Sequence, residues 1–109
     1  MTGPRVLPAP RTSEREWQAQ VVAEAKRFGW LVYHSWTSLN SAKGFPDLVL
    51  CHPRHGVVFA ELKTATGKVT KEQQDWLDTL SMAGARAYVW RPGDAYAVWT
   101  LIATGRWPS

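Results

Sequence analysis

The chain has 109 residues, the size of one small domain, and 45% of them are hydrophobic, so a packed core is feasible. Thirteen Lys and Arg against nine Asp and Glu give a net charge of +4, which suits a nucleic-acid partner without requiring one. The single cysteine, Cys51, excludes an internal disulfide, and no stretch has the pattern of a secretory signal or the length of a membrane span. We therefore expect a cytoplasmic protein.

The first twelve residues contain three prolines and no periodic pattern. We interpret residues 1–12 as a flexible arm and residues 13–109 as one domain. The domain opens with a helix, because Ser13 and Glu16 form the S-x-x-E capping box that satisfies free N–H groups at a helix start. Gly29 is a natural stop for this helix.

Three runs rich in branched and aromatic residues follow the helix. They are WLVYHSW at 30–36, PDLVLC at 46–51 and VVFAELK at 57–63, and each predicts a strand. The last two runs are joined by HPRHG, whose Pro and Gly favour a hairpin loop.

The second half of the chain predicts a helix, a strand and one ambiguous segment. Thr70 and Gln73 form a second capping box ahead of a helix, and RAYVW at 86–90 predicts the fourth strand. Residues 94–105 fit a helix best, although their β-branched content also permits a strand. The order of helix, three strands, helix and strand predicts an α/β fold with a mixed central sheet flanked by helices.

The predicted hairpin carries acids where an apolar strand is expected. If the loop spans residues 52–56, the pairing of the two strands places Asp47 directly opposite Glu61, on the face that also carries Lys63. Opposed residues have Cβ atoms about 5 Å apart. Two carboxylates at that distance repel each other unless a cation lies between them.

A divalent metal ion would remove this conflict. Hard carboxylate oxygens suit Mg²⁺ or Mn²⁺, so we predict a metal site between Asp47 and Glu61. Lys63 would orient a water molecule or hold a phosphate there. The alternative is a surface hairpin with solvated charges and a Glu–Lys ion pair. The apolar strands, and the Gly44 and Pro46 that precede Asp47, favour the metal site.

Three motifs together resemble a known family. They are the G-x-P-D-L of Gly44–Leu48, the E-L-K of Glu61–Lys63, and KEQQDWLDTLSMAGARAYVW at 71–90. Over residues 13–90 the chain resembles the VRR-NUC domain, the virus-type replication–repair nuclease branch of the PD-(D/E)XK nucleases. The resemblance implies a restriction-endonuclease-like αβββαβ core and metal-dependent hydrolysis of DNA phosphodiester bonds. It also implies a homodimer that acts on branched or flapped DNA, associated with the nucleoid or active in a phage-infected cell.

The resemblance assigns roles to the hairpin residues. The positions of Asp47 and Glu61 bind metal in the family, and the backbone carbonyl at the position of Leu62 commonly adds a ligand. The lysine that matches Lys63 supports the nucleophilic water.

The family also carries an acidic residue on its first helix and a glutamine on its second. Glu14 is the better candidate for the acid, because the capping box already explains Glu16, although an ordinary first-turn acid favoured by the helix dipole remains an alternative. Gln73 matches the glutamine, and its capping box with Thr70 is an equally good explanation.

Three lysines are expected to flank the metal and bind DNA phosphates: Lys43, Lys68 and Lys71. Trp36 could stack on an unpaired base, although core packing explains it better. Cys51, His52 and His55 lie close in sequence, but a zinc site would need a fourth ligand at suitable spacing.

Three functional alternatives remain open at this stage. The first is a DNA-binding module without catalysis that uses the same basic face. The second is a restriction-type endonuclease that recognises a DNA sequence. The third is a protein–protein adaptor without salt-dependent affinity for DNA.

Overall fold

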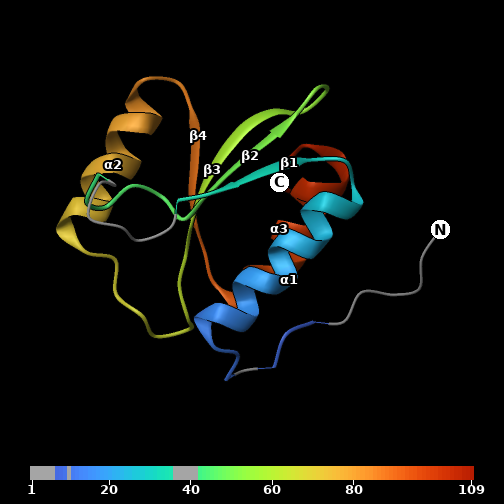
Figure 1. The fold of residues 1–109 in the computed structure, drawn as a ribbon, viewed down its shortest axis with the longest axis horizontal. Coiled ribbons are helices and arrows are strands. Elements are labelled where there is room, and N and C mark those ends of the chain that lie inside the picture. Colours follow the sequence, from blue (N-terminus) through green and yellow to red (C-terminus); the bar gives the residue numbers. More distant parts are fainter. Residues whose placement is uncertain (1–6, 10, 36–41) are drawn as a thin grey trace.

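The computed structural model describes residues 7–9, 11–35 and 42–109. Its helices and strands are, in chain order, α1 (Glu14–Arg27), β1 (Leu31–His34), β2 (Leu48–His52), β3 (Gly56–Leu62), α2 (Lys71–Met82), β4 (Arg86–Trp90) and α3 (Ala95–Thr104), with a short 3₁₀ turn at Pro92–Asp94. Figure 1 shows α2 on one face of the sheet, and α1 and α3 together on the other.

The strands form one mixed sheet in the order β1-β2-β3-β4. β1, β2 and β3 are antiparallel neighbours, and β4 lies parallel to β3. Parallel neighbours need a crossover connection, and α2 provides it. The predicted α/β class with a mixed sheet is therefore confirmed, and residues 95–104 of the ambiguous segment form a helix.

Both predicted capping boxes are present. At α1, the Glu16 N–H donates to Ser13 Oγ at 3.1 Å, and the Ser13 N–H donates to Glu16 Oε1 at 3.0 Å. A cap of this kind is worth about 1 kcal/mol of helix stability. The predicted role of Glu16 in the capping box of α1 is therefore confirmed.

The hydrophobic core lies between the sheet and the pair α1 and α3. Trp17, Val21 and Ala25 recur every four residues along α1, so they share one buried face. They pack against inward-facing residues of the sheet and of α3, which include Leu48, Leu50, Val58, Ala60, Leu62, Trp90, Val98, Leu101 and Ile102. Burying each large aliphatic or aromatic side chain is worth about 1.5–3 kcal/mol.

The register of the β2–β3 hairpin agrees with the sequence prediction. Cys51 pairs with Val57 and Leu48 pairs with Ala60. The turn itself is shorter than predicted, because His52 still pairs with Gly56. One step beyond the Leu48–Ala60 pair, this register brings Asp47 level with Glu61.

Gly44 shows why the turn before β2 needs glycine. Its φ is +87°, in the region that side chains disfavour, and a Cβ atom there would lie 2.5 Å from the backbone carbon of Glu72. The turn that presents Asp47 is therefore packed directly against the first turn of α2.

Trp36 lies outside the described residues, so neither core packing nor base stacking is tested for it. The division into an arm and a domain also stays a prediction. Within the described part of the chain, no helix is both long enough and apolar enough to cross a membrane.

Candidate active site

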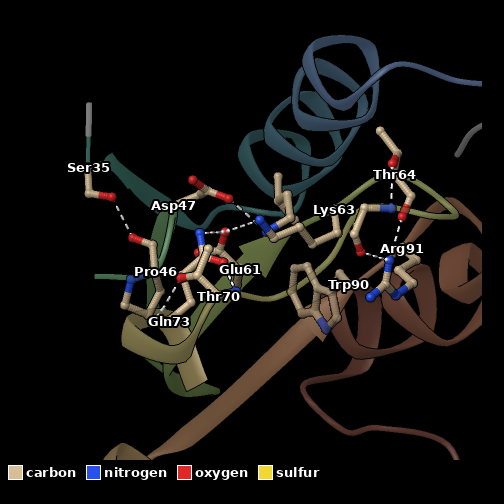
Figure 2. A network of polar contacts seen from close by, with 12 residues as sticks. Ser35, Pro46, Asp47, Glu61, Lys63, Thr64, Thr70, Gln73, Trp90 and Arg91 are labelled. Carbon is tan, nitrogen blue, oxygen red and sulfur yellow. Dashed lines mark hydrogen bonds and ion pairs between the residues drawn. The ribbon is translucent and has the colours of Figure 1, made fainter. Parts of the chain in front are cut away.

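The candidate site lies where the start of β2 meets the end of β3. Figure 2 shows Asp47, Glu61, Lys63 and Gln73 converging there from β2, β3 and α2. Glu61 and Lys63 are two residues apart, so their side chains leave the same face of the sheet, on the side that α2 covers.

Asp47 is fixed by a backbone hydrogen bond from the neighbouring strand. The Leu62 N–H donates to Asp47 Oδ2 at 2.8 Å. In the hairpin register Leu62 lies level with Pro46, which has no N–H to pair with the Leu62 carbonyl. Because the N–H and C=O of a strand residue point to the same side, that carbonyl is directed toward the side on which Asp47 lies. This geometry supports the predicted role of the Leu62 carbonyl as a ligand.

Glu61 is a buried carboxyl group with an exposed fraction of 2%. Gln73 Nε2 donates to Glu61 Oε2 at 3.0 Å, and Lys63 Nζ lies 3.6 Å from the same oxygen. The other oxygen, Oε1, is buried and has no hydrogen-bond donor among the described residues. The two other atoms in this condition are the indole nitrogens of Trp90 and Trp99, which are neutral. A charged oxygen without a partner is much more costly than these.

The surroundings of Glu61 raise its pKa to about 8. Burial is the largest cause, followed by the negative charge of Asp47 and the proximity of its side chain. Lys63 opposes the shift, and Glu14 adds to it. The repulsion that the sequence predicted between Asp47 and Glu61 is therefore a property of the structure, and one carboxyl keeps its proton at neutral pH when no cation is near.

These residues fit a hard divalent cation. Each acid uses one oxygen for an internal hydrogen bond, and Glu61 Oε1 has no hydrogen-bond partner in the part of the chain that the structure describes. Two carboxylates and a strand-end carbonyl are the oxygen donors that Mg²⁺ and Mn²⁺ prefer. No three His, Cys, Asp or Glu side chains in the described ranges are grouped closely enough to hold a metal by themselves. Ligands beyond the two acids would therefore come from backbone, water or phosphate.

Gln73 makes the contacts expected for both explanations that the sequence left open, and its role in the site stays a prediction. Its Oε1 accepts from the Thr70 N–H at 2.9 Å, which closes the capping box, while its Nε2 donates to Glu61. The two ends of one amide group thus connect the start of α2 to the buried acid.

Glu14 is exposed, although helical spacing places it in line with the buried Trp17. It is the first residue of α1, so it lies beyond the stretch of helix that packs on the sheet. Its pKa is nevertheless raised, first by partial burial and then by the charge of Asp47, while Lys63 lowers it. Glu14 is therefore near enough to interact electrostatically with Asp47 and Lys63. Its catalytic role stays a prediction.

The three lysines predicted to bind DNA differ in their surroundings. Lys43 lies 4.0 Å from Glu72, and Lys71 lies 3.0 Å from Asp75. Both are exposed pairs of the kind that contributes little to stability. Lys68 is exposed in the loop after β3.

A groove of about 660 Å³ begins next to this site, between α1 and β1. Gln18 and His34 form one wall, joined by a 2.7 Å hydrogen bond, and the rim includes Arg15 and Lys26. His34 is followed by Ser35, whose N–H donates to the Asp47 carbonyl at 2.9 Å. His34, which lines the groove, is therefore next to the residue that hydrogen-bonds to Asp47.

The histidines of the hairpin turn belong to the opposite end of the sheet. His52 and His55 stack with ring centroids 4.2 Å apart, and both rings contact Trp30. The neighbouring Cys51 is exposed. This arrangement is one of aromatic packing.

Sequence reasoning missed the hydrogen bond from the Leu62 N–H and the whole contribution of Arg91. Arg91 Nη1 donates to the carbonyls of Thr64 and Gly67, at 2.7 Å each. An arginine that binds carbonyls leaves no sequence signal, because every residue has a carbonyl. Its position just after the fourth predicted strand was the only available hint.

Comparisons with known proteins identify the family and the fold. The profile of the VRR-NUC domain matches residues 8–92. One solved structure, described as a VRR_NUC domain protein, superposes with a TM-score of 0.63 at 17% identity, over 89% of this chain and 98% of its own. A second, described as a VRR_NUC domain, gives a TM-score of 0.60 at 26% identity, over 85% and 98%. No curated protein matches the chain. Since the profile covers most of the sequence, the chain belongs to the VRR-NUC family of nuclease-type domains.

Proposed function

We propose that this protein is a divalent-metal-dependent deoxyribonuclease that hydrolyses phosphodiester bonds. The observation that carries the proposal is the buried Glu61, whose Oε1 has no donor among the described residues and whose neighbour is a second acid. A buried acid beside a second carboxylate is costly to keep unless it has a function, and functional sites are where such pKa shifts gather.

Asp47, Glu61 and the Leu62 carbonyl would hold the ion. When bound, Mg²⁺ or Mn²⁺ would supply Lewis-acid polarisation of the scissile phosphate and a lowered pKa for the attacking water. The raised pKa of Glu61 means that this residue must first lose its proton for the ion to enter.

The chain's own residues then have separate tasks. Lys63 is held with its ammonium 3.6 Å from Glu61, where it orients the attacking water and offsets negative charge on the phosphate. Gln73 keeps Glu61 in one orientation through its amide. Glu14, close enough to influence Asp47, acts from the periphery on the water shell around the site.

The substrate would approach across basic side chains on both sides of the acids. Lys68 is exposed on one side, and Arg15 and Lys26 line the groove on the other. Lys43 and Lys71 would exchange their carboxylate partners for phosphates, which costs little because exposed pairs are weak. DNA affinity should therefore fall steeply with salt.

The preference for branched or flapped DNA in replication or repair, and action as a homodimer, rest on the family resemblance. In a symmetric dimer two sites would cut two strands of one junction.

A cleavage assay tests the proposal. Purified protein is incubated with Mg²⁺ or Mn²⁺ and a panel of flap, fork and four-way DNA, beside a duplex plasmid. Cutting of branched DNA that disappears with EDTA and with Asp47→Ala is expected. Salt-sensitive binding without cutting would instead indicate a non-catalytic DNA-binding module. A ladder of discrete plasmid fragments would indicate a sequence-specific endonuclease.

A further inference from the structure

Arg91 lies next to the candidate site without belonging to the acid cluster. It follows directly after β4, and its backbone N–H donates to Asp94 Oδ2 at 2.9 Å, which fixes where its side chain starts. One guanidinium nitrogen then donates to two carbonyls of a single loop, those of Thr64 and Gly67, as Figure 2 shows for Thr64. Charge-assisted hydrogen bonds of this kind are stronger than neutral ones.

The loop that Arg91 holds runs directly from the end of β3. Within the loop, the Gly67 N–H donates to Thr64 Oγ1 at 2.9 Å. The loop is therefore held by one hydrogen bond between two of its own residues, Thr64 and Gly67, and by the hydrogen bonds from Arg91. Residues 64–69 belong to no helix or strand, so contacts such as these fix the shape of the loop.

The closed loop lies against the side chain of Lys63. A Cβ atom added at Gly67 would lie 3.6 Å from Lys63 Cδ, so the loop backbone covers the aliphatic part of that lysine. Only 12% of the Lys63 side chain is exposed. The Lys63 N–H is tied to the Trp90 carbonyl at 3.1 Å, immediately before Arg91. The lysine is thus confined between the end of β4 and the loop that Arg91 folds.

From these contacts we infer that Arg91 is a positioning residue for Lys63, acting through the 64–67 loop. Without the guanidinium, two loop carbonyls lose their donor, the loop opens, and the ammonium is no longer restricted to the neighbourhood of Glu61. This inference rests on the proposed nuclease function, because it assigns Arg91 to the geometry of that site.

The sheet offers a matched control at its other end. Arg86, the first residue of β4, also binds two backbone carbonyls, donating to Gly105 at 2.7 Å and to His55. Both arginines are half-buried and both fasten a loop, but Arg86 lies far along β4 from Lys63. Their variants should cost similar stability, and they should differ only in what happens to Lys63.

The test is a double-mutant cycle in single-turnover cleavage of flap DNA with Mn²⁺. Arg91→Met should lower the cleavage rate about 10- to 100-fold, the usual range for groups that orient active residues, with little change in DNA affinity. In the Lys63→Ala background the same substitution should cost less than about threefold, because the residue it positions is gone. Arg91→Lys should recover part of the rate. Arg86→Met should leave the rate unchanged in both backgrounds.

An equal loss from Arg91→Met with and without Lys63, or the same loss from Arg86→Met, would overturn the inference. Hydrogen exchange of the 63–69 peptide provides a readout that needs no activity: exchange should speed up in Arg91→Met and Arg91→Lys, and not in Arg86→Met. Unchanged exchange in Arg91→Met would refute the inference that Arg91 holds the 64–67 loop. If the wild-type protein cuts no DNA but the 63–69 peptide still exchanges faster in Arg91→Met than in the wild type, the proposed function is refuted. The role of Arg91 in holding the loop then stands.

Discussion

An arginine binds backbone carbonyls at each end of the sheet, but the charged groups around it differ between the two ends. Arg86 fastens one end and Arg91 the other, each by donating to two backbone carbonyls. At the Arg86 end the surrounding groups are stacked rings, with His52 and His55 packed on each other and on Trp30. At the Arg91 end two acids face each other.

The contrast separates stabilising structure from function. Ring stacking and carbonyl clamps stabilise a fold, whereas a buried carboxyl oxygen without a donor destabilises it. Glu61 therefore marks its end of the sheet as the one shaped by something other than stability. The predictions below test whether the two ends really differ in this way.

The largest effect should come from Glu61→Gln, which keeps the shape of the side chain and removes its charge. Cleavage should fall roughly 100- to 1,000-fold, because the charge that would hold the ion is lost. In EDTA the variant should melt at a higher temperature than the wild type at pH 8, because the buried acid no longer has to ionise. Cys51→Ser, on an exposed residue of β2 toward the other end, is the control and should change neither quantity. A variant that still cuts at the wild-type rate contradicts the metal site.

The next effect should come from Lys63→Ala. Turnover should fall by about 100-fold, as for the loss of a group that activates or orients the nucleophile, while DNA affinity is largely kept. Binding is measured by titration in Ca²⁺ or EDTA, and turnover with Mg²⁺. Unchanged turnover would show that the 3.6 Å contact with Glu61 is only a structural ion pair.

A smaller effect separates the two functions of Gln73. Thr70→Ala removes one half of the capping box, and Gln73→Ala removes the other half together with the amide contact to Glu61. Both should cost about 1 kcal/mol in stability, measured by urea unfolding. Only Gln73→Ala should also slow cleavage, by about 10-fold. Equal activities of the two variants would make Gln73 a cap alone.

The smallest effect is a pH dependence of opposite sign at the two ends, measured as melting temperature in EDTA. The pKa of Glu61 is raised from 4.5 to about 8, so protonated Glu61 favours the folded state. This contribution to stability is complete below pH 4.5 and is lost as the pH rises toward 8. The pKa of His55 is lowered from 6.5, by burial first and then by His52 and two arginines, so its effect is complete above pH 6.5 and is lost below it.

Above pH 6.5 only the Glu61 effect should remain. The melting temperature should therefore decline by a few degrees between pH 6.5 and 8, and Glu61→Gln should remove that decline. A decline that persists in the variant would mean that another group titrates in this range.

Much of this architecture follows from local sequence patterns. Ser13–Glu16 and Thr70–Gln73 define two helix starts because a capping box is a short-range device. The hairpin register follows from the length of a tight loop, and with it the opposition of Asp47 and Glu61.

The rest depends on contacts between distant segments. The approach of Gly44 to Glu72, the bond from the Leu62 N–H to Asp47, and the Arg91 clamp all involve the backbone. Backbone groups are the same in every residue, so the sequence does not mark which ones meet. Helical spacing places Glu14 in line with the buried Trp17, yet Glu14 is exposed, because helical periodicity does not tell where the sheet beneath a helix ends.

The carbonyl of Trp90 links the candidate site to a buried side chain that can be followed by NMR. It accepts the Lys63 N–H and also the indole N–H of Trp17, a wholly buried side chain of α1, at 2.9 Å. The indole proton of Trp17 has its own resonance in a proton–nitrogen spectrum. Its shift would therefore report, from inside the core, on any disturbance of the oxygen that also anchors the lysine.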